Sequence, residues 1–197
     1  MARRREGSRP GPAPSVALPT VATAPPSAGD DWLGLSDDPL PLGDAVTWAT
    51  LPSCGAVVSF TGTARDHSPG RPDVAGLEYE AYEEQVVPRL ERLAAALRRR
   101  WPDLGRIVLV HRTGPVGLTE ASVLVVVSSP HRPEAFAAAR AGIDTLKATL
   151  PVWKREVWAD GDDWALESCA VGEPDDDGLV VVDPGAGPSA HDHRGVA

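Results

Sequence analysis

The chain has 197 residues, of which 42% are hydrophobic and 24% charged, so it is long enough for one soluble domain with a real core. Its formal net charge of −9 argues against general nucleic-acid binding, which needs a basic face. No apolar run reaches the roughly 18–20 residues that a membrane-spanning helix requires. Cys54 and Cys169 show no metal-binding spacing and are typical of free thiols in a reducing compartment. We therefore expect a cytoplasmic protein without a metal or a cofactor.

Composition divides the chain into three parts. Residues 1–29 are rich in Ala and Pro, and residues 171–197 are acidic and rich in Gly and Pro. Neither segment has enough apolar residues to offset the cost of ordering, so both are predicted to be disordered tails. The apolar residues 179–182 leave open a short edge strand. Residues 30–170 are predicted to form the folded domain.

The first half of this domain mixes helical and strand patterns. Residues 44–51 are compatible with a short helix. Residues 55–65 and 74–82 are predicted strands, joined by a loop rich in turn formers. Apolar residues spaced three and four apart predict a helix over 83–101, which Pro102 ends.

The second half of the domain also mixes helical and strand patterns. Residues 107–110 and 122–129 are β-branched and predict strands, with a turn-bearing segment between them. Pro133 opens the second main helix, whose apolar stripe continues to Leu150. Strands are expected at 152–158 and 164–168, around a Gly-Asp-Asp turn. The order of elements predicts an α+β fold with two main helices.

Basic residues mark both ends of the second main helix. His131 and Arg132 stand at its start, and Lys147 and Lys154 lie near and beyond its end. An acidic protein that concentrates cations around one element is expected to bind an anion there. Arg132 is unfavourable beside the positive end of a helix dipole, and an anionic ligand would resolve that misfit. The alternative is that Arg132 pairs with Glu134 or with solvent.

The two lysines differ in their predicted surroundings. Lys147 lies at the edge of the helix's apolar stripe, where a lysine either extends its ammonium into water or, if partly buried, becomes a candidate base or nucleophile. Lys154 and Arg155 are neighbours on a strand, so their side chains should point to opposite faces. Only one of them is then expected to face a given pocket.

A further cation ends the first long strand. Gly62 in this strand indicates a bulge or a close backbone approach. Arg65 at the strand end can offer a bidentate fork to a phosphate or carboxylate, or else form a surface salt bridge with Asp66. His111 and Arg112 repeat the His-Arg pair without a helix start beside them, which favours a structural role.

Several motifs occur in an order and spacing that resemble one known family. They are GAVVSFTGTAR, LEYEAYEE, RWPDLGRIVLVHRTGPV, SSPHRPEAFAAARAGIDTLKATLPVWKRE and GDDW. Together they cover about residues 30–168 and resemble the large, catalytic subunit of molybdopterin synthase. The resemblance implies an α/β hammerhead-type fold with antiparallel sheets.

The resemblance also implies a reaction and an assembly. Sulfur would pass from the C-terminal Gly-Gly thiocarboxylate of a small ubiquitin-like subunit to cyclic pyranopterin monophosphate, which forms the dithiolene of molybdopterin. This is a step of molybdenum cofactor biosynthesis. Two large subunits would form a homodimer with one small subunit on each side, a heterotetramer.

Carried onto this chain, the resemblance implies catalytic roles for Lys147 and Lys154 and a pocket-lining role for Phe60. The implied substrate-contacting positions also include Thr63, Ala64, Arg65, His131, Arg132, Arg155 and Glu156. Thr63 and Ala64 depart from the family pattern, because many relatives have a basic residue and a larger aliphatic there.

Two other interpretations stay open at the sequence level. One is a non-catalytic paralogue that binds the small subunit or a pterin, against which the retention of both lysines argues. The other is an unrelated lysine Schiff-base enzyme that acts on a phosphorylated carbonyl compound.

Overall fold

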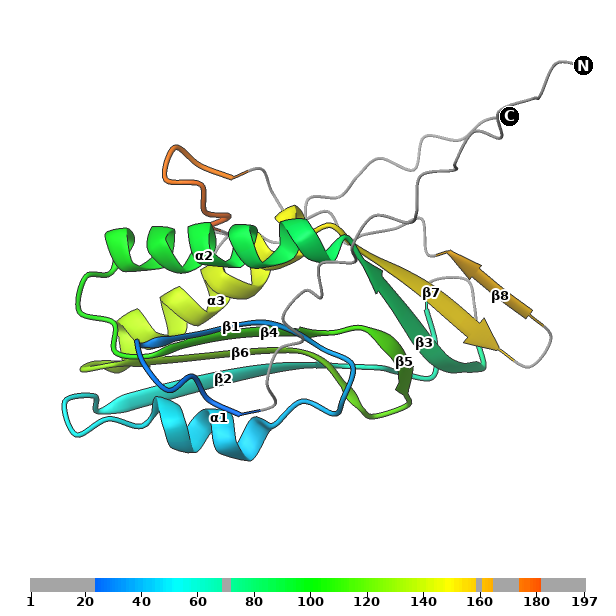
Figure 1. The fold of residues 1–197 in the computed structure, drawn as a ribbon, viewed down its shortest axis with the longest axis horizontal. Coiled ribbons are helices and arrows are strands. Elements are labelled where there is room, and N and C mark those ends of the chain that lie inside the picture. Colours follow the sequence, from blue (N-terminus) through cyan, green and yellow to red (C-terminus); the bar gives the residue numbers. More distant parts are fainter. Residues whose placement is uncertain (1–23, 69–71, 159–160, 165–173, 182–197) are drawn as a thin grey trace, which may run out of the picture.

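A computed structural model describes residues 24–68, 72–158, 161–164 and 174–181 of the chain. It consists of two four-stranded sheets and three helices. Helices cover both faces of the first sheet, and the second sheet extends from one end of this sandwich (Figure 1). The α+β class is confirmed. No helix in these described ranges is long and apolar enough to cross a membrane.

The first sheet has the strand order β1–β4–β6–β2. Its strands are β1 (Asp31–Ser36), β4 (Ile107–Arg112), β6 (Ala121–Ser129) and β2 (Ala56–Thr63). The pairings of β6 with β2 and β4 are antiparallel, but β1 pairs with β4 in parallel. The expected antiparallel sheets are present, and the parallel pairing of β1 with β4 is the exception. The strand β1 had no counterpart in the sequence prediction, because its Gly and Ser break the apolar pattern.

Helices pack on both faces of this sheet, which explains why its central strands are apolar at nearly every position. The helix α1 (Leu42–Ala49) lies on one face, and α2 (Glu83–Arg100) and α3 (Arg132–Thr149) lie on the other. In β6, Val123 and Val125 face the α2–α3 side, whereas Leu124 and Val126 face α1. The short helix is thus a third helix beside the two main ones.

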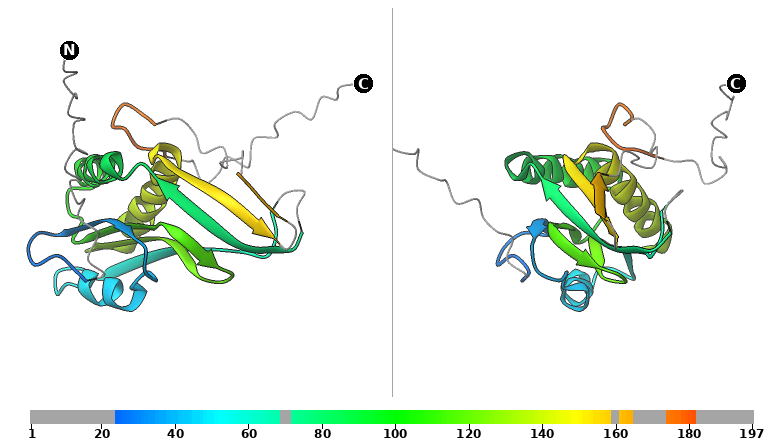
Figure 2. Two further views of the ribbon diagram at one scale, coloured as in Figure 1. Left: turned by 45° about the vertical axis from the view of Figure 1, so that its right-hand side comes forward. Right: turned by 90° about the vertical axis from the view of Figure 1, so that its right-hand side faces the viewer.

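The second sheet has the order β5–β3–β7–β8, and all its pairings are antiparallel. Its strands are β5 (Gly114–Gly117), β3 (Val74–Ala81), β7 (Val152–Trp158) and β8 (Gly161–Trp164). Figure 2 shows this sheet leaving the end of α3. The strand β7 has the predicted bounds. The last strand occupies the predicted turn, and residues 165–168 of the expected strand lie outside the described residues.

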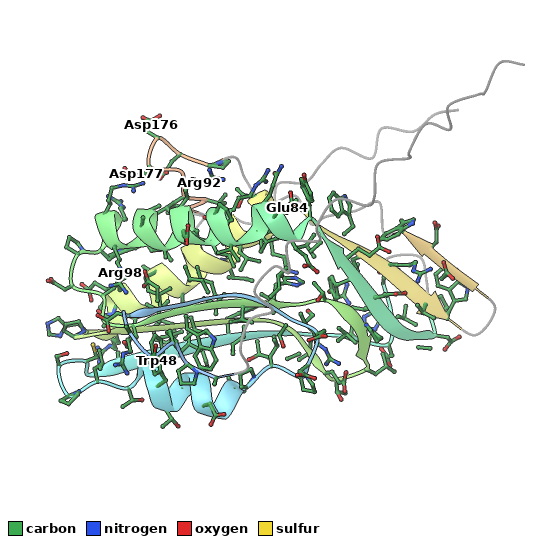
Figure 3. All side chains as sticks on the ribbon, viewed as in Figure 1. Trp48, Glu84, Arg92, Arg98, Asp176 and Asp177 are labelled. Atoms are coloured by element: carbon green, nitrogen blue, oxygen red, sulfur yellow. The ribbon has the colours of Figure 1, made fainter. Side chains whose placement is uncertain are left out.

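A short C-terminal segment packs back onto the helices. Leu179 and Val180 are buried, and Leu179 belongs to the core between the sheet and α2–α3. The Val180 backbone N–H donates to the hydroxyl of Thr145 in α3 at 2.7 Å. Asp176 and Asp177 lie beside α2 (Figure 3). The expectation of a loose tail is wrong for residues 174–181, because two apolar residues were enough to anchor this segment.

Candidate active site

The two lysines meet at one aromatic ring. Tyr79 of β3 is 7% exposed and lies directly opposite Lys154 of β7 in the sheet register. Lys147, near the end of α3, places its Nζ atom 5.9 Å from the centre of the Tyr79 ring. The end of α3 and the inner face of the second sheet therefore bring both lysines to Tyr79. An ammonium over a tyrosine face gains a cation–π attraction.

A buried histidine supports this ring from the first sheet. His111 is 1% exposed and meets Tyr79 edge to face, with 5.0 Å between ring centres. Its Nδ1 atom lies 2.7 Å from the carbonyl oxygen of Arg112, so Nδ1 carries a proton and donates it to that oxygen. Burial, and secondarily the positive charge of Lys147, lower the pKa of His111 to about 3. The imidazole is therefore neutral near pH 7.

These lysines are also the only two in the sequence. Of the 19 basic residues other than histidine, 17 (19 minus Lys147 and Lys154) are arginines. Arginine stays charged, whereas a lysine ammonium can lose its proton when its surroundings lower the pKa. Both lysine side chains of the chain therefore lie near one ring.

Lys154 belongs to a short polar network. Its Nζ atom donates to Oε1 of Glu156 at 2.8 Å, and the hydroxyl of Ser68 donates to Oε2 of the same carboxylate at 2.6 Å. Glu156 is 3% exposed. The resemblance implies substrate contact for Glu156, but here both its carboxylate oxygens bind protein atoms.

Arg155 lies on the opposite face of the second sheet. It pairs with Glu78 directly across the strand and with Asp162 of β8 at 3.3 Å. Its guanidinium also lies 5.9 Å from the ring centre of Trp164. The hydrogen bond to Glu78 is the main cause that raises the pKa of Arg155. The prediction that Lys154 and Arg155 diverge is confirmed, and the structure does not bring Arg155 to the lysines.

The end of β2 lies at the same end of the first sheet as His111. Gly62 pairs with Val123, which in turn pairs with His111. A Cβ atom on Gly62 would approach Cγ1 of Val123 to 2.6 Å, so a close approach requires glycine here. The register also shifts between Gly62 and Thr63, as the bulge prediction expected. The bulge turns the chain toward Arg65.

Three of the implied substrate positions follow this bulge. Thr63 is exposed, whereas Ala64 is buried and uses its backbone N–H and carbonyl in bonds to Glu120 and Thr119. Arg65 donates its Nε–H to the carbonyl of His67 at 2.9 Å. Its two terminal NH2 groups have no partner in the described ranges. Arg65 thus keeps the bidentate end of its guanidinium available, and the alternative, a salt bridge with Asp66, does not form between these two described residues.

Phe60 lies farther back on β2, which is an edge strand of the first sheet. It pairs with Val125 and shares the α3 face of the sheet, yet it is 40% exposed. Phe136, in the first turn of α3, is 64% exposed. Two exposed aromatic rings on one edge strand and its covering helix indicate a surface that another molecule covers.

His131 and Arg132 are at the other end of the same helix. Both are exposed, and Arg132 has no hydrogen bond or ion pair with any residue that the structure describes. At 1.5 Å per residue, Arg132 and Lys147 are about 22 Å apart along α3. One chain therefore does not bring these two cations to one small ligand, although the sequence places all of them around one helix.

Sequence reasoning missed Tyr79, Ser68 and the position of His111. The sequence places Tyr79 within a predicted strand, and its alternation with Glu78 and Glu80 is the signal that marks it as the inward residue. Counting lysines separately from arginines would have singled out Lys147 and Lys154 without any structure. Nothing in the sequence pairs Ser68 with Glu156, because 88 residues separate them.

The chain matches a known protein family. Residues 35–149 match the MoaE protein family, which is more than half of the chain. The chain therefore belongs to the MoaE family, the catalytic subunits of molybdopterin synthase, and so to molybdenum cofactor biosynthesis.

Individual relatives agree with this assignment. A molybdopterin synthase catalytic subunit of Aedes aegypti is 43% identical over 132 residues, which is 67% of this chain and 84% of the relative. One from Nostoc is 42% identical over 132 residues, 67% of this chain and 79% of the relative. The crystal structure of molybdopterin synthase from Staphylococcus aureus superposes with a TM-score of 0.64 at 33% identity, covering 68% of this chain and 96% of the other.

Proposed function

We propose that the chain transfers sulfur to cyclic pyranopterin monophosphate from the C-terminal thiocarboxylate of a small ubiquitin-like partner. For each sulfur, a carbon–sulfur bond forms at a side-chain carbon of the pterin while a carbon–oxygen bond of that same carbon breaks, and its oxygen leaves as water or stays on the opened phosphate. Water then cleaves the acyl carbon–sulfur bond and restores the carboxylate of the partner. Two such transfers form the dithiolene of molybdopterin. The observation that carries the proposal is the convergence of the only two lysines on Tyr79.

The chemistry of this site suits two anions. A thiocarboxylate and a cyclic phosphate are both negatively charged, and a protein of net charge −9 repels them except where cations gather. We assign Lys147 to the thiocarboxylate and to the charge that develops as sulfur attacks the pterin. Lys154 positions the substrate, and the open end of Arg65 is suited to its phosphate.

The partner is proposed on the same grounds. In the described part of the chain, Cys54 is the free cysteine, and it does not belong to the lysine site. A sulfur donor supplied by a second protein therefore fits the site. One solved structure with a similar fold, from Helicobacter pylori, is a complex of subunits 1 and 2 of molybdopterin-converting factor.

A second copy of this chain would complete the site. His131 and Arg132 lie beside the start of β2, because Ala56 pairs with Ser129, whereas Thr63 ends the same strand. A twofold axis midway along β2 and α3 would bring Arg132 of each copy to the lysine end of the other. It would also cover Phe60 and Phe136. We propose this homodimer, with one small subunit beside each site, as the heterotetramer.

Reconstitution tests the proposed reaction. The purified chain, the thiocarboxylated small subunit and the pterin precursor should together yield molybdopterin. Lys147→Ala should fold and bind the small subunit, yet lose about 10²-fold or more in rate. Lys147→Arg keeps the charge but cannot release a proton, so its rate separates charge stabilisation from proton transfer. Near-normal product formation by Lys147→Ala would refute the assigned role.

A further inference from the structure

A buried carboxylate connects two segments that are far apart in the sequence. Glu156 is 3% exposed on the inner face of β7, opposite Leu77 of β3. Burying an ionised carboxylate is costly unless its oxygens are paired and hydrogen-bonded. Lys154 binds Oε1 and Ser68 binds Oε2, so each oxygen has a defined partner. Each of these two contacts comes from a different segment of the chain.

The contact with Ser68 restricts how the carboxylate can orient. Lys154 and Glu156 are two residues apart on one strand, so their side chains share a face and can meet in several rotamers. A single ion pair leaves the carboxylate free to turn. A hydroxyl 2.6 Å from the second oxygen fixes the carboxylate plane, and with it the position of the Lys154 ammonium. The side chain of Lys154 is still 33% exposed and can reach a ligand.

Ser68 also belongs to the segment that carries Arg65. The Nε–H of Arg65 binds the carbonyl of His67, next to Ser68, and the backbone N–H of Val74 binds the carbonyl of Asp66. The connection between β2 and β3 is thus tied to itself at Arg65 and to β7 at Ser68. The hydroxyl of Ser68 therefore links the segment that carries Arg65 to β7, the strand that carries Lys154.

We propose that Ser68 is a positioning residue of the active site, which acts through Glu156 to hold Lys154 at a fixed distance from the Arg65 segment. This proposal deepens the proposed function, on which its effect on turnover rests. Its effect on the Lys154 amine does not depend on that function, so the two can fail separately.

The first test measures the amine directly. Because Lys147 and Lys154 are the only lysines, cleavage at arginine after brief acetylation releases residues 141–155, which carry both. The ratio of acetylation at Lys154 to that at Lys147 is then an internal measure within one molecule. Glu156→Gln and Ser68→Ala should each raise this ratio, by about threefold or more, because a Lys154 amine that is no longer held by a fixed carboxylate is more accessible to the reagent.

The second test uses a matched pair of variants. Ser68→Thr keeps the hydroxyl and Ser68→Val replaces it by a methyl group of similar size. The threonine variant should keep the wild-type acetylation ratio and turnover, whereas the valine variant should behave like Ser68→Ala and lose about tenfold in kcat. Thr47→Ala, which removes an exposed hydroxyl from α1, controls for the loss of any surface hydroxyl.

The outcomes separate the two proposals. A raised ratio with unchanged kcat would keep Ser68 as a determinant of the Lys154 position but overturn the assigned role of that position in turnover. An unchanged ratio in both Ser68→Ala and Ser68→Val, with a raised ratio in Glu156→Gln, would overturn the role of Ser68. If the threonine variant lost as much kcat and as much thermal stability as the valine variant, Ser68 would have only a structural role.

Discussion

The two ends of α3 differ in how their basic side chains are held. At the C-terminal end, Lys147 lies over Tyr79, and Tyr79 rests on buried His111. At the N-terminal end, His131 and Arg132 are exposed, and Arg132 has no protein partner in the described ranges. The first end is organised within one chain, whereas the basic residues of the second end face solvent. We therefore propose that the catalytic chemistry belongs to the lysine end and that the arginine end contributes to the site of another copy.

The lysine end of α3 is also stabilised by the C-terminal segment, and this contribution can be measured. Leu179 is fully buried in the core, and the next residue binds Thr145 of α3. Leu179→Ala should lower the free energy of unfolding by about 2–4 kcal/mol, the usual cost of a buried leucine. Urea unfolding measures this loss in the free energy of unfolding.

Val181→Ala is the matched control, because Val181 is 53% exposed. Its effect should stay within about 0.5 kcal/mol. Removal of residues 171–197, which the sequence alone predicts to be harmless, should now destabilise the chain as much as Leu179→Ala does. A full-stability truncation would show that the segment does not support α3.

Substrate binding gives a second comparison between the two ends. Arg65→Ala and Arg132→Ala should each weaken binding of the pterin precursor by about 1–3 kcal/mol, because each removes a charge-assisted hydrogen bond to an anion. Calorimetric titration of the dimer measures this loss. Arg92→Ala removes an exposed arginine from α2 (Figure 3) and should leave affinity unchanged. Unchanged affinity in both Arg65→Ala and Arg132→Ala would show that the phosphate of the precursor binds elsewhere.

A third effect depends on pH and also concerns the lysine end. The pKa of His111 is about 3 in the folded chain, against an ordinary value of 6.5. Between these values the unfolded chain binds a proton that the folded chain does not, so stability falls as the pH falls from about 6.5 to 3. One such group contributes up to about 1.4 kcal/mol per pH unit.

His111→Gln cannot titrate, so its stability should fall less steeply over this range than that of the wild type. Urea unfolding at several pH values measures both slopes, and comparing slopes removes any constant loss from the substitution itself. Equal slopes in the two proteins would show that His111 is not buried as a neutral imidazole.

Much of this fold was predictable from the sequence, because the apolar periods of α2 and α3 and the β-branched runs of β4 and β6 are strong local signals. The strands β1 and β5 were missed, since Gly34 interrupts the apolar pattern of β1, and β5 contains only four residues, GPVG. Their formation depends on pairing with β4 and β3, which local sequence does not encode. The buried segment at Leu179 was missed for the same reason.

The site was predictable only in part. Resemblance and charge pattern singled out Lys147, Lys154 and Arg65, because basic residues near a helix end are visible in the sequence. The separation of Arg132 from the lysines follows from the length of α3, which the apolar period of the sequence already predicts. The contact of Ser68 with Glu156 depends on tertiary structure alone.

Mixing Arg132→Ala with Lys147→Ala, at a precursor concentration too low for the Arg132→Ala dimer to bind it, tests most directly whether one active site uses both ends of α3 from two copies. Arg132→Ala and Lys147→Ala homodimers each lack one component at both sites. A mixed dimer of the two restores both components at one of its sites. Random exchange at equal amounts should therefore recover about one quarter of the wild-type rate of molybdopterin formation. A mixture no more active than its two components would contradict the shared site, and with it the roles that this account assigns to the two ends of α3.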